Sequence, residues 1–193
     1  MNKRIPILVI ASALALSACG SSTPTVSMDY PTYSTVAELD RVADVVVLGQ
    51  IGARTSTEYD NGGNEEVGDE GQPLGIPMAF FDFTVQKVLQ GDLTDKTITV
   101  EWIDTSKVTL EDSTSDLKQG QTVVLWLQHL TTQDAPGVTS VSDFWVPVSG
   151  DNGVMDVAAG HATARSETLT GLKTPGQERL SISQEALAAA LAS

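Results

Sequence analysis

The stretch 79-AFFDFTV-85 decides the expected fold, because apolar and polar residues alternate along most of it. The odd positions from 79 to 85 are all apolar, whereas Asp82 and Thr84 are polar, and Phe80 is an exception on the polar side. A period of two is typical of a strand that buries one face. The stretch therefore predicts a strand whose odd-numbered side chains lie in the core.

Further strand signals lie on both sides of this stretch. Beyond a turn at residues 90–95, alternation resumes over 98–102 and predicts an antiparallel partner. The runs 44-DVVVLGQI-51 and 123-VVLWL-127 are apolar without alternation, which favours strands covered on both faces, and Gly49 within the first indicates a bulge. Residues 144–148 and 154–157 add two shorter signals. One core is predicted to contain Phe81, Phe83, Val85, Ile98, Val100, Trp102, Val123, Leu125 and Leu127.

Helix signals flank the strands at the two ends of the domain. Thr35 and Glu38 have the spacing of a capping box, which predicts a short helix over 36–43. Leu187 and Leu191 lie four residues apart in an alanine-rich run, which predicts a terminal helix over 183–192. Five or six closely spaced strands with helices only at the ends predict a mainly β fold, a small, largely antiparallel barrel or sandwich.

The order of three motifs carries a resemblance. A strand 45-VVVLGQI-51 is followed by V-x-x-V-L-x-G at 85–91 and by L-x-x-G-x-x-V-V-L-x-L at 117–127. This order is similar to a module of uncharacterised secreted bacterial proteins, which in turn looks like the oligonucleotide/oligosaccharide-binding (OB) barrel of netrin-like and metalloprotease-inhibitor domains. The resemblance implies an OB-like barrel over about 36–157 and implies no catalytic residues. Such barrels bind ligands through one face and its loops.

The N-terminus has the pattern of an export signal. Lys3 and Arg4 precede an apolar run over 5–16, which is too short for a helix that crosses a bilayer, since about 20 residues are needed. The tetrad 16-LSAC-19 then resembles the lipobox of bacterial lipoproteins. The resemblance implies that residues 1–18 are a cleaved signal peptide and that Cys19 carries diacylglycerol and palmitate. We therefore expect a lipoprotein on the extracytoplasmic face of the cell membrane.

The amino-acid composition indicates how the rest of the chain is divided and which partners it disfavours. Residues 19–33 are rich in Ser, Thr and Pro and are expected to form a flexible tether, with a single domain over 34–193. The formal net charge is −14 and the sequence has no basic cluster, which argues against nucleic acid as a partner. Cys19 is the single cysteine, so no disulfide forms within the chain.

Residues 56–76 are acidic and glycine-rich, and we expect a disordered loop there. Clustered carboxylate and amide oxygens are also calcium ligands, and the weak candidates are Asp60, Asn64, Glu65, Glu66, Asp69 and Glu70. Their spacing does not match the EF-hand order. We therefore expect a solvated loop without a metal, and calcium binding is the alternative.

The candidates for catalysis are few. His129 and His161 are the groups that titrate near neutral pH in this sequence, and neither lies in a recognisable catalytic motif. We therefore expect no enzyme and no cofactor, but a lipid-anchored module that binds an unknown protein or small ligand. The alternative is a cell-envelope hydrolase that uses His129 or His161. The hydrolase requires one histidine to lie in a pocket with a carboxylate and a nucleophile.

Overall fold

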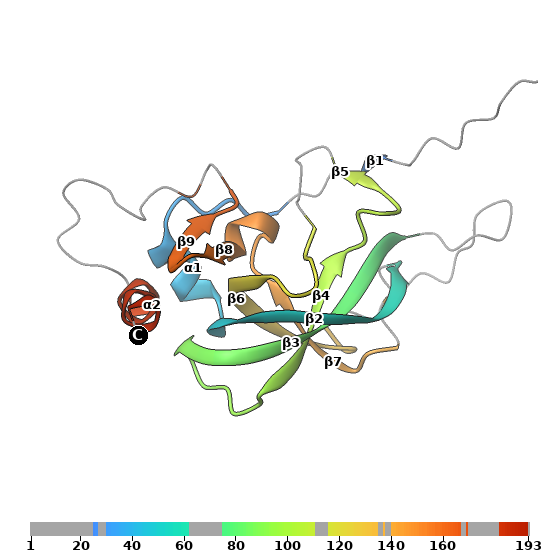
Figure 1. Cartoon of the computed structure of the whole chain (residues 1–193). Coiled ribbons are helices and arrows are strands. Elements are labelled where there is room, and N and C mark those ends of the chain that lie inside the picture. The colour runs from blue at the N-terminus through green and yellow to red at the C-terminus, as the bar shows by residue number, and fades with distance from the viewer. Residues whose placement is uncertain are drawn as a thin grey trace, which may run out of the picture.

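The computed structural model describes residues 25–26, 30–61, 75–110, 116–134, 137, 140–166, 169 and 182–192, and it confirms the mainly β class (Figure 1). The helices are α1 (Val36–Val42), α2 (Ile182–Leu191) and the 3-10 turn η1 (Gly150–Gly153). The strands are β1 (Thr25–Val26), β2 (Val45–Asp60), β3 (Ile76–Gln90), β4 (Thr97–Ile103), β5 (Thr109–Leu110), β6 (Thr122–Thr131), β7 (Asp143–Pro147), β8 (Val154–Ala158) and β9 (His161–Ala164).

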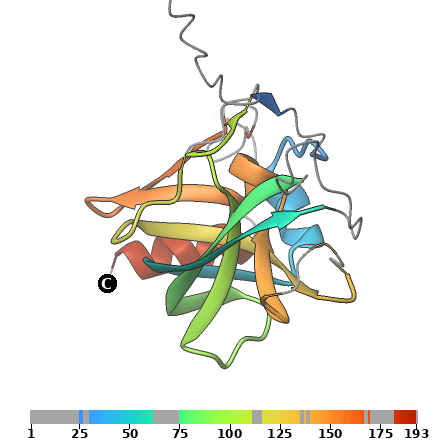
Figure 2. The same ribbon diagram turned by 90° about the vertical axis from the view of Figure 1, so that its right-hand side faces the viewer.

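Five strands form a closed ring. The order is β2-β3-β4-β7-β6, and β6 pairs back with β2, while β8 and β9 continue from the edge of β6 (Figure 2). Within this seven-stranded sheet the pairs are antiparallel except β4 and β7, which run parallel at Val100 and Trp145. The sheet is therefore largely antiparallel, as expected, and the parallel pair arises because β7 enters beside β4 from the hairpin with β6.

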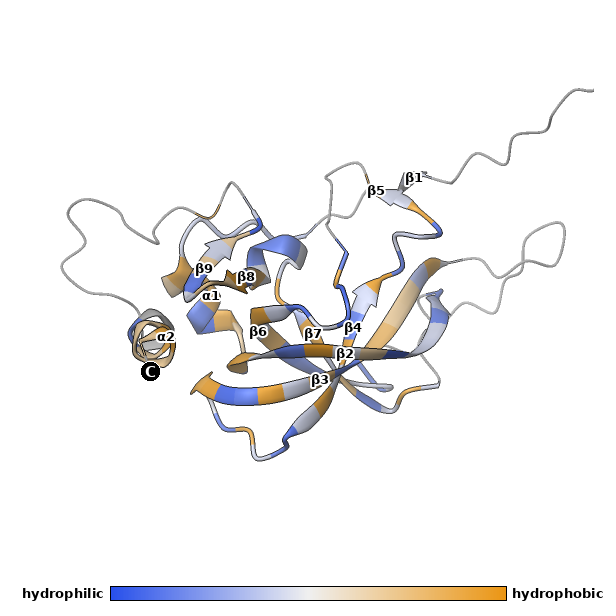
Figure 3. Cartoon of the chain, viewed as in Figure 1, coloured by the Kyte–Doolittle hydropathy of each residue, from blue (hydrophilic) through white to orange (hydrophobic). Residues whose placement is uncertain are grey.

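The predicted core lies inside the ring. Its buried members from the expected set are Phe83, Ile98, Val100, Trp102, Val123, Leu125 and Leu127, as predicted. Phe81 and Val85 are only partly buried, although they pack against this cluster. Figure 3 shows apolar and polar residues alternating along β3, which is the pattern that placed these side chains.

The outer face of β2 and β6 is also covered. Trp126, Leu39 and Leu187 belong to a second cluster formed by this face, α1 and α2. The capping box of α1 is confirmed: the backbone N–H of Glu38 donates to Thr35 Oγ1 (3.3 Å), and Glu38 Oε2 accepts from the Thr35 N–H (3.1 Å). Both apolar runs are therefore doubly covered strands, as predicted.

The outer face of β3 differs from the expectation. Phe80, expected on a wet face, is fully buried and packs edge-on against Phe144 of β7, with ring centroids 5.5 Å apart. The assignment was wrong because β7 brings a second apolar layer to the outside of the ring, which also includes Met78, Leu130, Val141 and Val146.

The N-terminal segment and the acidic loop are described only in part. The residues that lie outside the described part of the chain include 1–18, which are expected to be a signal peptide, together with Cys19, Asn64, Glu65, Glu66, Asp69 and Glu70. Strand pairing runs from the β2 end at Asp60 to the β3 start at Ile76, so the edges of the expected loop 56–76 are paired strand. Within the described part of the chain, neither helix has the length and apolar character needed to cross a membrane.

Candidate functional site

A cleft of about 280 Å³ lies on the outer face of β4. Tyr30 and Tyr33, from the segment before α1, border it. Its apolar walls are Met78, Ile103, Leu130, Val146, Pro147 and Val148. Its polar side chains include Asp60, Glu101, Gln128 and Ser149, and no Lys, Arg or His is among the described residues that line it. We call this feature the Glu101 cleft.

Glu101 is the unusual group in this cleft. The next residue of β4, Trp102, points into the ring. Because successive side chains of a strand point to opposite faces, Glu101 points outward. There it lies directly opposite Phe80 in the β3–β4 register. The residue is only 5% exposed, and none of the residues that the structure describes donates a hydrogen bond to its carboxyl group. Burial first, and then the charges of Asp60 and Glu58, raise the pKa of Glu101 to about 8. At neutral pH this carboxyl is therefore mostly protonated and neutral.

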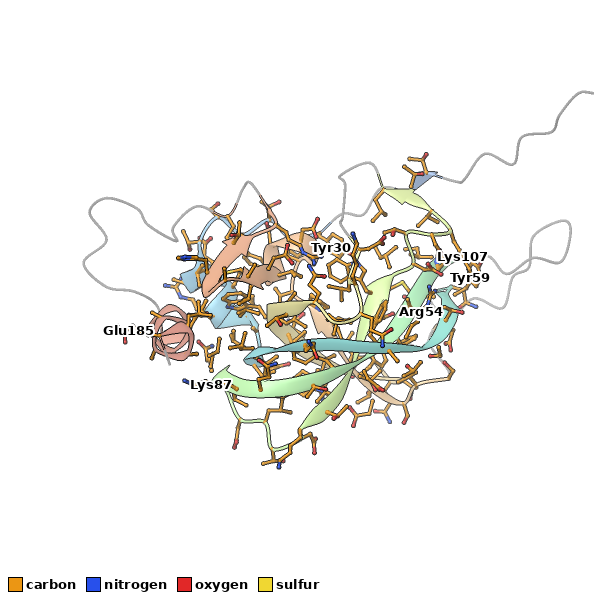
Figure 4. The ribbon with its side chains drawn as sticks, in the orientation of Figure 1. Tyr30, Arg54, Tyr59, Lys87, Lys107 and Glu185 are labelled. Atoms are coloured by element: carbon orange, nitrogen blue, oxygen red, sulfur yellow. The ribbon has the colours of Figure 1, made fainter. Side chains whose placement is uncertain are left out.

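Tyr30 forms the wall opposite β4. Its ring packs over Gly150, where a Cβ would lie 3.1 Å from the ring, and Gly150 has a positive φ of 57°. The Ser149 hydroxyl donates to the carbonyl of Pro31, which fixes the same segment to the start of η1. Burial, followed by the charges of Glu101 and Asp151, raises the pKa of Tyr30 to about 12, so the phenol stays neutral. Figure 4 shows Tyr30 over the sheet rather than extended away from it.

Trp102 connects this cleft to a second one of about 200 Å³. Its indole Nε1 is buried without a hydrogen-bond partner among the described residues. In the second cleft, Arg54 forms an ion pair with the buried carboxylate of Asp104. Burial alone would raise the pKa of Asp104, but hydrogen bonds from Arg54 and Ser106 outweigh it and lower that pKa. The second cleft therefore has its own internal cation, unlike the Glu101 cleft.

His129 does have a carboxylate partner, which the sequence did not indicate. Its Nε2 lies 2.5 Å from Asp143 Oδ1 on β7, and its ring lies 4.8 Å from that of Trp145. Both side chains of the pair are well exposed, at 40% and 70%. The hydroxyl of Thr131, cross-strand from Asp143, donates to Asp134 instead. The pair thus lies on the surface, and neither cleft described above includes it.

The other candidates are dispersed. His161 is exposed at the start of β9, far along the sheet from His129. Of the proposed calcium ligands, Asp60 is described, and it ends β2 at the edge of the Glu101 cleft. Glu58 of β2 accepts a hydrogen bond from the backbone of Ser140 (2.8 Å). Within the described ranges, no three His, Cys, Asp or Glu side chains are grouped so that they would hold a metal ion.

Comparisons with known proteins give no assignment. No known protein family matches the chain, and no curated protein matches its sequence. The functional argument therefore depends on the residues of this chain alone.

Proposed function

We propose that the protein is a lipid-anchored extracytoplasmic binding module whose ligand occupies the Glu101 cleft. The fold that we propose for it is an OB-type barrel. Numbered along the chain, the strands of the ring follow the order 1-2-3-5-4-1, and the third and fifth strands are parallel. This order supports the OB assignment, and in OB barrels the second and third strands form the binding face. Here these strands are β3 and β4, and β4 carries Glu101.

One observation carries the proposal: Glu101 is 5% exposed, has no hydrogen-bond donor among the described residues and lines an open cleft. The Glu101 oxygens are not among the fully buried side-chain atoms without a partner, so they are open to the cleft. A ligand that fills the cleft would replace water against this carboxyl group, which favours binding over a purely structural role.

The hydrolase alternative has a weaker basis. His129 has a carboxylate partner, as a catalytic histidine requires, but the Thr131 hydroxyl bonds to Asp134 rather than to the imidazole. A catalytic base also needs a pocket that holds the substrate against it. Neither His129 nor His161 is among the described residues that line the Glu101 cleft or the second cleft.

The binding proposal is tested by photocrosslinking in intact cells. Tyr33 borders the cleft and is partly exposed, so a photoreactive phenylalanine analogue at this position replaces one aromatic ring with another. Lys87, on the exposed side of β3, is the matched control, and Figure 4 shows it well away from Tyr30. We expect a light-dependent mass increase for the protein labelled at 33 and none for the protein labelled at 87. Equal labelling at both positions, or none at 33, would contradict a ligand in this cleft.

The anchor is tested separately. We expect wild-type protein to fractionate with membranes, to be extracted by detergent and to incorporate a labelled fatty acid, because the LSAC tetrad places Cys19 as the acylated residue. A Cys19→Ser variant should lose the label entirely. A Ser17→Ala variant keeps the cysteine and is the control. Absence of label in the wild type would overturn the lipoprotein assignment and leave the cleft unaffected.

A further inference from the structure

We infer that the Glu101 cleft binds an organic ammonium ion, with the cationic group against the Glu101 carboxylate and the carbon skeleton against the apolar walls. The inference rests on the proposed function, since it names the class of ligand for the same cleft. It follows from three features of the cleft: the buried carboxyl, the sign of the surrounding charges and the character of the walls.

The buried carboxyl sets the first requirement. Phe80 lies directly across from Glu101 in the β3–β4 register, and the described neighbours donate no hydrogen bond to it. An ionised carboxylate in such surroundings is strongly unfavourable unless an opposite charge is present. Nothing among the described lining residues supplies that charge, because Lys, Arg and His are absent from them. A ligand with its own positive charge meets this requirement directly.

The described charges that act on Glu101 and Tyr30 are negative. Asp60 lies in the lining and Glu58 lies close enough to raise the pKa of Glu101. On the opposite wall, Asp151 of η1 acts on Tyr30 in the same direction. Asp60 and Glu58 act from β2 and Asp151 acts from η1, so negative charge reaches the cleft from two sides. An anionic ligand would be repelled, and a cation would be attracted.

The walls select the rest of the ligand. Tyr30 and Tyr33 contribute aromatic surface, which attracts ammonium groups through the face of the ring. Most other lining side chains are apolar and suit a hydrocarbon body rather than the many hydroxyl groups of a sugar. The volume of about 280 Å³ is just below the range of about 300 to 1,000 Å³ that is typical of drug-sized ligands. The cleft therefore fits a small amine or a single cationic side chain.

Protonation gives the inference a distinctive signature. Because the pKa of Glu101 is raised to about 8, this carboxyl group is mostly neutral in the empty cleft at pH 7. An ammonium ion favours the ionised form, so binding displaces the proton, and the proton competes with the ligand below pH 8. The groups that face Glu101 do not change this sign: Tyr30 stays neutral up to about pH 12, and Asp60 and Glu58 are acids. Affinity for a permanent cation should rise about tenfold per pH unit up to pH 8 and then level off.

The test uses the purified full-length chain and two probes of the same shape. Choline is a permanent cation, and 3,3-dimethylbutan-1-ol is its neutral carbon isostere. Titration calorimetry between pH 6 and 9 should give a single choline site whose affinity rises about 50-fold from pH 6 to pH 8. The neutral isostere should bind at least tenfold more weakly at pH 8. Proton release on choline binding at pH 7 should appear as a dependence of the measured heat on the ionisation enthalpy of the buffer.

Variants assign the effect to the carboxyl group. Glu101→Gln keeps the shape and a hydrogen-bonding amide but removes the charge, so choline should lose its advantage over the isostere and its pH dependence. This variant should melt no lower than the wild type at pH 7, because the native carboxyl is already mostly neutral there. Glu185→Gln removes an exposed carboxylate on α2 and is the matched control, with no expected change.

Three outcomes would overturn the inference. They are equal affinity for the two probes at pH 8, no choline binding at any pH, and choline binding that Glu101→Gln leaves unchanged. In each case a positive crosslinking result at Tyr33 would still support a ligand in the cleft, of a neutral class. If neither the crosslink at Tyr33 nor choline binding is observed, the proposal that the protein is a binding module is itself contradicted.

Discussion

Replacing Phe83 with alanine is expected to lower the free energy of unfolding by about 3 to 5 kcal/mol. Phe83 is fully buried inside the ring, directly across from Ile98 on β4 and Ile51 on β2. Strands that are paired on both sides cannot collapse into the cavity that the missing ring would leave. The total free energy of unfolding of a domain of this size is about 5 to 15 kcal/mol, so the expected loss is a large share of it. Urea unfolding followed by tryptophan fluorescence measures the change.

The control is Lys87→Ala on the same strand, whose side chain is exposed and whose loss should cost less than about 0.5 kcal/mol. Phe83 gives a cleaner test than Trp102, which lines both clefts, so that water can enter the space left by truncation. Equal stability of the Phe83 and Lys87 variants would mean that the inner and outer faces of β3 are reversed.

Local patterns predicted the features that depend on neighbouring residues in the chain. The alternation over 79–85 and 98–102 predicted a β3–β4 pair, and the register joins Phe83 with Ile98 and Phe81 with Val100. The capping box predicted where α1 begins, because Thr35 and Glu38 satisfy each other within one turn. Gly49 predicted a bulge, and the β2–β3 register shifts between Leu48 and Gly49.

Features that depend on distant segments were not predictable in this way. The alternation pattern places Phe80 and Glu101 on the outer face of the ring. The pattern alone predicts that residues on this face are exposed to solvent. Phe144 on β7 covers Phe80. Tyr30, in the segment expected to be a tether, borders the cleft that contains Glu101. The parallel β4–β7 pair, which creates this arrangement, has no local sequence signal. The Glu101 cleft was therefore missed, although Glu101 was visible as the acidic residue inside an apolar strand.

The histidine pair was missed for the same reason. The sequence marks His129 as a candidate catalytic group, but its partner Asp143 begins a different strand and meets it across the β6–β7 pairing. A strand signal over 144–148 did not specify which strand it would join. Likewise, the short strand signal over 154–157 did not specify the partners of β8, which are β6 and β9.

Gly49→Ala is expected to cost about 3 kcal/mol, the upper end of what overpacking a core usually costs. A Cβ at this position would lie 2.2 Å from the carbonyl oxygen of Thr84 and 2.6 Å from two ring atoms of Phe83. The carbonyl belongs to the backbone of β3, so it cannot move without opening the β2–β3 pairing next to the bulge. Ala53→Ser, at an exposed position of the same strand, is the control and should change stability by less than about 0.5 kcal/mol.

A double-mutant cycle separates the two contacts of that Cβ. Phe83→Leu removes the ring atoms near position 49 but leaves the Thr84 carbonyl in place. If the carbonyl is the main obstacle, the double variant should be as unstable as the sum of the single changes predicts, within about 0.5 kcal/mol. A coupling energy above about 1 kcal/mol in favour of the double variant would instead identify the Phe83 ring as the group that excludes a side chain at Gly49. In that case the close approach of β2 and β3 would be a consequence of core packing rather than of the bulged backbone.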